Sequence, residues 1–366
     1  LYNLSIPVAD TSDTTRATAA NQLLQQLLVR ASGTTKVRDK MPPEDFALAP
    51  EAYKDHPRYA VWHELTSAQR LITQFSYKSS NELITLAGGD QVRAQILELE
   101  FDPAGVSQLL RRLELPIWDS NRPRTLFWIA LEGRQGRYLV SPESNEPLSD
   151  ALLTRASQRG LPTTLPNSKI HPIPSTLLSD VWGGFAREVL DASQIYKPDA
   201  VAIARIQPSG NSWTVQWQLF TGIDSVTHRA SVATLGAALD EGVNFVAEEL
   251  SRRYASQPGE GTGTYRVRVS NVQSTRDYAA LTRYLNGLSL TSQVRIVQAQ
   301  DQQLLLELGL RGGLSQFRAN LALDGRMKEE PFLGLQQSRN YSEAVNTSAP
   351  AAQAGQVDAY FRWQSN

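Results

Sequence analysis

Two apolar runs in the middle of the chain constrain its fold more than any other feature. Residues 124–133, RTLFWIALEG, are apolar almost throughout, and residues 199–206, DAVAIARI, have the same character. A strand exposed on one face alternates apolar and polar residues, whereas a continuous run indicates a strand covered on both faces. Helical patterns alternate with these runs, so we predict a mixed sheet with helices packed on it.

The second run ends in a turn rather than in a loop that holds a ligand. Residues 207–211, QPSGN, are typical of a hairpin turn, and another strand, NSWTVQWQLF, follows. The run is therefore predicted to be scaffolding. Trp213 and Trp217 lie four residues apart on the following strand and share one of its faces. They are either core residues or a surface that binds a sugar or a protein partner.

The two ends of the chain follow one plan. Residues 96–115, ILELEFDPAGVSQLLRRLEL, resemble residues 304–323, LLLELGLRGGLSQFRANLAL, with the strands shifted by one residue. Upstream, YNLSIPV and a helix correspond to YRVRVSNV and a helix. We predict an α+β / α/β protein in which two β-α-β-β-α-type repeat modules flank the mixed-sheet α/β domain. Chance similarity between amphipathic segments is the alternative.

Composition and loop residues set the predicted boundaries. The N-terminal βα module has a helical insertion, in which residues 59–75 are predicted to be a helix with Trp62, Leu65, Ile72 and Phe75 facing inward. Residues 256–264 and 338–356 are predicted to be flexible linkers. The four predicted parts are the N-terminal module at 1–120, the central α/β domain at 121–256, the C-terminal βαββα module at 263–325 and a flexible tail at 326–366.

The tail ends in an aromatic strand, VDAYFRWQSN. Phe361 and Trp363 alternate with Tyr360 and Arg362. An aromatic strand on a flexible tether is suited to adding to the edge of a sheet, either that of its own chain or that of another. Tyr360, Phe361 and Trp363 are therefore predicted binding residues, together with the two tryptophans at 213 and 217.

No pattern in the chain predicts catalytic residues, a metal site or a cofactor. The absence of cysteine excludes thiolate ligands and cysteine nucleophiles, and the four histidines do not have the spacing of a zinc site. Glu98 and Glu100 share one side of a strand, and they are either solvated or a pair of acids beside a substrate. The net charge of −1 gives no support to nucleic-acid binding, and no apolar run is long enough to span a membrane.

Several phrases resemble known envelope families. LLQQLLVRASGTTKV, LLRRLELPIWDSNRPRTLFWIALEG, RGLPTTLP and DVWGGF are similar to a gammaproteobacterial family, the domain of unknown function 2066, across most of residues 1–325. This resemblance implies an exported envelope protein and no known activity. KPDAVAIARI followed by WTVQWQLF is similar in pattern to the amino-terminal domain of the Tol translocation protein B, and the whole plan to the periplasmic flagellar-ring protein T. These relatives bind proteins or build assemblies, although fold analogy gives only a prior about function.

The leading hypothesis is a non-enzymatic periplasmic scaffold that binds envelope proteins or associates with itself. The first residue is Leu1, and a strand begins almost at once, which is typical of a secreted protein whose signal peptide has been removed. One alternative is a protein that binds or processes envelope glycans through Trp213, Trp217, Glu98 and Glu100. A second alternative is a sensor that binds a small molecule beside the central sheet.

Overall fold

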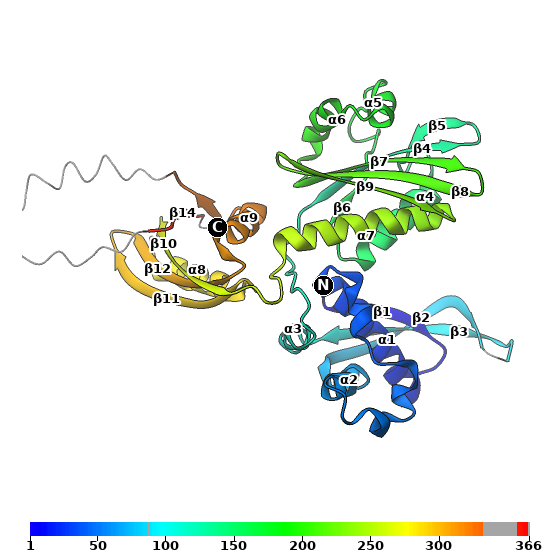
Figure 1. Ribbon diagram of the computed structural model, residues 1–366, viewed down its shortest axis with the longest axis horizontal. Coiled ribbons are helices and arrows are strands. Elements are labelled where there is room, and N and C mark those ends of the chain that lie inside the picture. The colour runs from blue at the N-terminus through cyan, green and yellow to red at the C-terminus, as the bar shows by residue number, and fades with distance from the viewer. Residues whose placement is uncertain (87, 332–356, 365–366) are drawn as a thin grey trace, which may run out of the picture. The chain divides into compact units, whose positions relative to one another are not determined.

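The computed structural model describes residues 1–86, 88–331 and 357–364. The chain is an α+β protein that forms two compact units, residues 1–258 with two sheets and residues 259–366 with one, each with its own helices (Figure 1). The division falls inside the segment 256–264 that was predicted to be a linker. The other predicted linker, 338–356, lies outside the described residues.

The first unit begins with an antiparallel sheet whose strand order is β1-β3-β2. The hydroxyl of Ser12 caps the first helix by accepting a hydrogen bond from the backbone N–H of Thr15, and Gly33 ends that helix in the left-handed conformation. The elements are β1 (Asn3–Val8), α1 (Asp13–Ser32), α2 (Tyr59–Leu65), β2 (Ile72–Thr85), β3 (Gln91–Phe101) and α3 (Pro103–Arg112), with 3₁₀ turns at Thr35–Lys40, Glu44–Ala47, Pro50–Tyr53 and Ala68–Leu71.

The prediction of one helix over residues 59–75 is wrong in its second half. Trp62 and Leu65 are buried on α2 as expected, but Ile72 and Phe75 belong to β2, and Phe75 is 48% exposed. The apolar spacing fits a helical period over its whole length. From Ile72 onward, however, the chain makes ladder hydrogen bonds with β3 instead, so pairing between strands overrides the local pattern.

The central sheet of the same unit has the strand order β5-β4-β7-β8-β9, with β6 beside β4. Every residue from Thr125 to Leu131 is buried, which confirms the prediction of a strand covered on both faces. The predicted turn after the second apolar run is also present. The elements are β4 (Thr125–Gly133), β5 (Gly136–Leu139), α4 (Glu146–Gln158), β6 (Thr163–Thr164), α5 (Leu177–Gly183), α6 (Ala186–Ser193), β7 (Ala200–Ser209), β8 (Ser212–Thr221), β9 (Asp224–Val232) and α7 (Leu235–Tyr254), with a 3₁₀ turn at Gln194–Tyr196.

The C-terminal end of α1 is bonded to the central part of the unit. The last carbonyl groups of a helix have no partner within the helix. Here the carbonyls of four successive residues, Arg30 to Gly33, each accept a hydrogen bond from a donor beyond residue 116. The donors are, in order, Arg122 Nη2 at 2.7 Å, Trp118 N at 2.8 Å, Ser251 Oγ at 2.7 Å and Arg159 Nη2 at 2.9 Å.

Arg122 is the central residue of this contact. Its guanidinium is buried and donates hydrogen bonds to five backbone carbonyls, including those of Arg30 at the end of α1 and Arg159 just after α4. Burial lowers the pKa of Arg122 to about 9, which leaves it charged at neutral pH. A cation at the C-terminal ends of two helices also interacts favourably with their dipoles.

The second unit has a sheet with the order β11-β12-β10-β14-β13. Its first three strands and two helices follow the same order along the chain as β1, α1, β2, β3 and α3. β10, β12 and β11 also lie side by side in the same antiparallel order as β1, β3 and β2. The elements are β10 (Thr262–Ser270), α8 (Thr275–Gly287), β11 (Thr291–Gln300), β12 (Gln303–Arg311), α9 (Gly313–Asp324), β13 (Met327–Glu329) and β14 (Ala359–Trp363).

Candidate functional site

The two tryptophans of β8 do not form an exposed stripe. Trp217 is fully buried, and its ring packs edge-on against Phe127 with 6.1 Å between ring centroids. The indole also lies against Gly242 of α7, where a Cβ atom would come within 2.0 Å of the ring. Trp213 is half-buried and pairs with Val232 of β9. Trp217 is thus a core residue whose ring a ligand outside the folded domain cannot reach.

The aromatic residues of the last strand are also mainly core residues. β14 lies between β10 and β13, so it docks onto the sheet of its own unit. Phe361 and Trp363 are buried and Tyr360 is half-buried. β13 and β14 both fall within residues 326–366, which were predicted to be a flexible tail ending in an aromatic strand.

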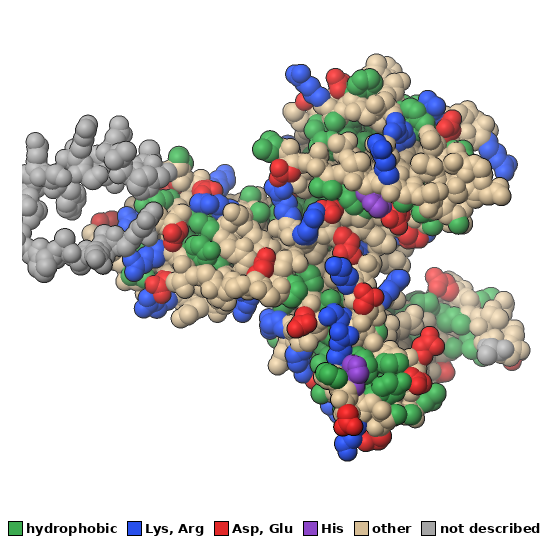
Figure 2. Space-filling model, viewed as in Figure 1, with side chains coloured by type: hydrophobic (Ala, Val, Ile, Leu, Met, Phe, Trp, Pro, Cys, Tyr) green, Lys and Arg blue, Asp and Glu red, His purple; other side chains and the backbone are tan. Residues whose placement is uncertain are grey.

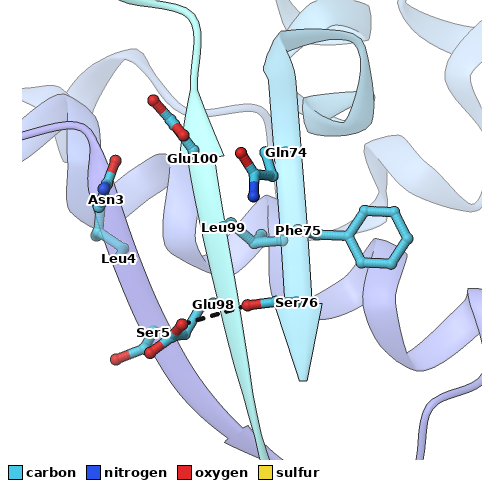
Figure 3. A pocket seen from close by; sticks show the side chains of 9 residues that line it. All are labelled: Asn3, Leu4, Ser5, Gln74, Phe75, Ser76, Glu98, Leu99 and Glu100. Carbon is cyan, nitrogen blue, oxygen red and sulfur yellow. Dashed lines mark hydrogen bonds between the residues drawn. The ribbon is translucent and has the colours of Figure 1, made fainter. Parts of the chain in front are cut away.

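Glu98 and Glu100 lie on the outer face of the β1-β3-β2 sheet, the face opposite the buried side chains of β3. They line a shallow hollow of about 300 Å³ with polar side chains from all three strands, as Figure 3 shows. Phe75 also borders the hollow, but its ring points away from the acids. The other polar side chains are Asn3 and Ser5 of β1 and Gln74 and Ser76 of β2.

The two acids differ in their surroundings. Glu98 accepts hydrogen bonds from Lys78 Nζ at 2.6 Å and from Ser76 Oγ at 3.2 Å, and the bond from Lys78 lowers the pKa of Glu98. Glu100 is exposed. Glycosidases place two carboxyl groups on opposite sides of the scissile bond, whereas these two project side by side from one strand. The structure also places them on a different sheet from Trp213 and Trp217, so it does not bring the four predicted glycan residues together.

The histidines pack against aromatic rings. The ring of His56 stacks on Trp62 with 4.2 Å between centroids, and the ring of His63 lies edge-on to Tyr59 at 4.6 Å. Within the ranges that the structure describes, no group of three histidine, aspartate or glutamate side chains is placed to hold a metal ion. In the same ranges, no helix is both long and apolar enough to cross a membrane.

The β2–β3 hairpin extends well beyond the third strand of its sheet. β1 pairs with β3 only between Gln95 and Glu100, whereas β2 stays paired with β3 up to the pair Thr85 and Gln91. We call the projecting part, residues 79–86 and 88–94, the arm (Figure 1). Its two strands pair from Thr85 and Gln91 to Leu83 and Arg93 and, after an irregularity in the ladder, again at Ser79 and Gln95.

The arm carries apolar side chains that have no core to enter. Leu83 is 59% exposed and Leu86 is 38% exposed, and Ile84 and Val92, which pair across the hairpin, are half-exposed. Figure 2 shows hydrophobic side chains along the arm on the face in view. Because side chains alternate along a strand, Leu83 projects from one face of the arm, and Ile84, Leu86 and Val92 project from the other.

Sequence reasoning did not find the arm. The signal was present, since ITQFSYKSSNELIT is rich in residues that favour strands and a Gly-Gly pair precedes the next alternating run. The helical interpretation of residues 59–75 concealed its beginning. No sequence pattern states whether a hairpin ends level with its sheet or projects beyond it.

The comparisons with known proteins identify one segment of the chain. The model of a family described as a domain of unknown function (DUF8605) matches residues 52–119, which are 68 of the 366 residues. This segment includes the arm and the two acids of the hollow. The domain of unknown function 2066 and the Tol translocation protein B, named above as resemblances, are not shown by these comparisons. No curated protein matches the chain.

One solved structure is similar to part of the chain, the crystal structure of the Thermus thermophilus Protein Y N-terminal domain. The sequence identity is 10%, and the match covers 35% of this chain and 93% of that one, with a TM-score of 0.18. A likeness this low supports no argument about function.

Proposed function

We propose that this chain is a non-enzymatic interaction or scaffold protein of the periplasm, exported with its signal peptide removed, that binds an envelope protein through the arm. The observation that carries the proposal is the arm, with Leu83 and Leu86 exposed beyond the end of the sheet. Apolar side chains gathered on an exposed element are typical of sites of protein interaction, and here Ile84, Leu86 and Val92 share one face of the arm while Leu83 lies on the other. The envelope location is supported by the sequence resemblances.

The arm has the physical features of a binding element. Pairing between its two strands restricts its backbone before binding, which reduces the conformational entropy lost when a partner docks. Burying a leucine side chain contributes roughly 1.5–3 kcal/mol. Two leucines on opposite faces suit a partner that encloses the arm rather than one that covers a single side.

The proposal includes the two repeat modules. The elements β1-α1-β2-β3-α3 and β10-α8-β11-β12-α9 share their strand order, which supports an origin from one repeated module. The central domain, with helices on its covered strands, holds the N-terminal module through the end of α1. In this proposal the central domain is a rigid base from which the arm projects.

The test is a full-length variant that carries both Leu83→Asp and Leu86→Asp. We expect it to fold normally, because both side chains are outside the core, and to lose binding to an envelope partner. The matched control carries Ser225→Asp and Thr227→Asp, two exposed positions on β9 of the same unit. A partner would be captured by the wild-type chain from an envelope extract, identified, purified and titrated against the three proteins.

The expected result is a Kd at least about tenfold weaker for the arm variant, since the loss of two buried leucines exceeds 1.4 kcal/mol. The control should bind like the wild-type protein. Equal affinities for the arm variant and the wild type would overturn the proposal, as would turnover of an envelope substrate by the purified protein.

A further inference from the structure

In the second unit, the edge of β10 shows what kind of segment this type of sheet accepts. β14 runs parallel to β10, from the pair Val267 and Ala359 to the pair Ser270 and Arg362. Just before the strand, Asp358 donates its backbone N–H to the carbonyl of Arg266 at 2.8 Å, and its Oδ2 accepts the backbone N–H of Arg266 at 2.7 Å. An acidic residue therefore caps the start of this added strand.

The apolar side chains of β14 extend the core beneath the sheet. Phe361 packs edge-on against Phe317 of α9 with 6.0 Å between ring centroids, and Trp363 contacts Tyr284 of α8 at 5.9 Å. The added strand thus contributes both backbone pairing and an alternating apolar face. These are the two components of strand addition as a mode of peptide recognition.

β1 is the strand that corresponds to β10 in the first unit. Asn3 pairs with Glu100 and Leu4 with Leu99, just as Arg266 pairs with Glu307 and Val267 with Leu306. The two edges therefore have the same register against their neighbouring strand. Asn3 is therefore equivalent to Arg266, and each following residue of β1 is equivalent to the next residue of β10.

The outer edge of β1 offers free backbone groups. The carbonyl of Tyr2 accepts the N–H of Phe101, so Tyr2 and alternate residues after it turn their backbone groups toward β3. Asn3, Ser5 and Pro7 therefore turn theirs outward, and all three residues are exposed. Within the described part of the chain, no hydrogen-bond partner is found for these outward groups. Pro7 has no N–H, which is typical of an edge strand.

Burial at equivalent positions shows the effect of the missing strand. Val267 and Val269, next to β14, are both 0% exposed. Their counterparts on β1 are less covered, because Leu4 is 7% exposed and Ile6 is only half-buried. An apolar side chain placed beside Ile6 would complete this end of the core as Phe361 does in the second unit.

We propose that the outer edge of β1 binds an extended segment of a partner protein, which runs parallel to β1 as β14 runs beside β10. The segment has an acidic residue opposite Asn3, followed by alternating apolar side chains that face the helices. Its acidic side chain accepts the N–H of Asn3, and its backbone bonds to the carbonyl of Asn3, to the outward groups of Ser5 and to the carbonyl of Pro7. The inference rests on the proposed function and names the type of partner segment that the N-terminal module recognises.

The probe for this site is a synthetic peptide with the sequence of residues 357–364, VDAYFRWQ, added to the full chain. Hydrogen exchange of the backbone amides of Asn3 and Ser5 is the readout. At a peptide concentration about ten times its Kd, we expect exchange at these two amides to slow about tenfold. The same peptide with Phe361→Ser should protect them much less, because it lacks the aromatic side chain that faces the helices.

The variant Ser5→Pro removes one outward N–H and should abolish the protection, whereas Ser5→Ala, which keeps the N–H, should not change it. Several results would overturn the proposal. These are unchanged exchange at Asn3 and Ser5, protection that persists in Ser5→Pro, or amides already protected in the free chain by residues 332–356 or a second copy. Protection confined to Arg266–Ser270 would show exchange with the chain's own β14 and would also overturn it.

The arm lies beyond the part of β3 that pairs with β1, and the outer edge of β1 faces away from β3, so their failures can be told apart. The variant with Leu83→Asp and Leu86→Asp should bind the peptide as the wild type does. Loss of peptide binding alone would remove the inference about β1 and leave arm-dependent partner binding intact. Peptide binding without any effect of the arm on a partner would remove the proposed role of the arm.

Discussion

The two βαββα regions of this protein share strand order, and β1 and β10 share their register against the neighbouring strand, but the regions differ in what covers them. In the C-terminal region, β14 and then β13 cover the edge of β10, and the β11–β12 hairpin turns at Asp301 and Gln302, directly after its pairing with β10 ends. In the N-terminal region, no described strand pairs with the outer edge of β1, and the β2–β3 hairpin continues into the arm. The same strand arrangement is therefore covered by its own chain in the C-terminal region, whereas in the N-terminal region it leaves the edge and the arm that we propose as binding surfaces.

The largest expected effect comes from removing the side chain that closes the C-terminal region. Phe361→Ala deletes a ring that is 1% exposed. We expect the free energy of unfolding of residues 259–366 to fall by about 3–5 kcal/mol, through lost burial and the cavity left behind. Denaturant unfolding measures this change. Arg362→Ala, on the exposed face of the same strand, should change it by less than about 0.5 kcal/mol.

If Phe361→Ala were as stable as Arg362→Ala, β14 would not be part of the folded core in solution. The edges of the two regions would then be equally open, and the comparison would fail.

The next effect concerns the contact between the end of α1 and the central sheet region of the same unit. Arg122→Met removes donors to five backbone carbonyls that face a buried site. We expect a loss of about 2–4 kcal/mol in the stability of residues 1–258, because buried acceptors without a donor are costly. Arg134→Met at an exposed turn is the matched control. Similar unfolding midpoints for both variants would mean that the carbonyls are solvated.

Gly33→Ala tests the same attachment through its backbone. Gly33 has a φ of +72°, and a Cβ there would lie 2.5 Å from Ser251 Cβ and from Trp118 Cε3. Overpacking and the left-handed conformation together should cost about 2 kcal/mol, measured by thermal unfolding. Gly88→Ala, which meets no atom within 4 Å, should be close to neutral. A neutral Gly33→Ala would show that the end of α1 is not tightly held.

The smallest effect is electrostatic and appears in both regions. The pKa of Glu98 is lowered by Lys78, and that of Glu307 by Arg295, each through a hydrogen bond across neighbouring strands. A lowered carboxyl pKa adds stability at neutral pH, which is lost as the pH falls through the folded-state value. Lys78→Met should raise the pKa of Glu98 toward 4.5, as followed by NMR titration. Arg295→Met should likewise raise the pKa of Glu307. A pKa change in only one of the two variants would show that the cross-strand pair forms in one region and not in the other.

The parts of this fold that could be predicted from the sequence are those that local pattern determines. The buried strand at Thr125–Gly133, the end of α1 at Gly33 and the hairpin after β7 each follow from adjacent residues, whereas the sequence alone allowed either Ser12 or Asp13 to cap α1. The alternation of Phe361 and Trp363 also indicated a strand. This alternation does not predict which sheet edge the strand pairs with, because that depends on which sheet leaves apolar side chains uncovered at its edge.

The surfaces that carry the proposals were not predictable in the same way. Ile72 and Phe75 are strand residues because β2 pairs with β3. β3 lies further along the chain, so the local apolar spacing of residues 59–75 alone predicted a helix. Nothing in the sequence marks Arg122 as buried, since its partners are backbone carbonyls with no residue signature. The open edge of β1 depends on the absence of a strand, and a sequence does not state which edges remain uncovered.

The position of β14 has a consequence for how the protein is made. β10 and its parallel neighbour are separated by 92 residues at the pair Val267 and Ala359. A growing or translocating chain therefore cannot complete this sheet until residue 363 has emerged. Contacts between distant residues form late and slowly, so the flank of α8 and α9 stays uncovered throughout synthesis of the preceding segment. During that interval, this part of the nascent chain is most exposed to chaperones, proteases and misassembly.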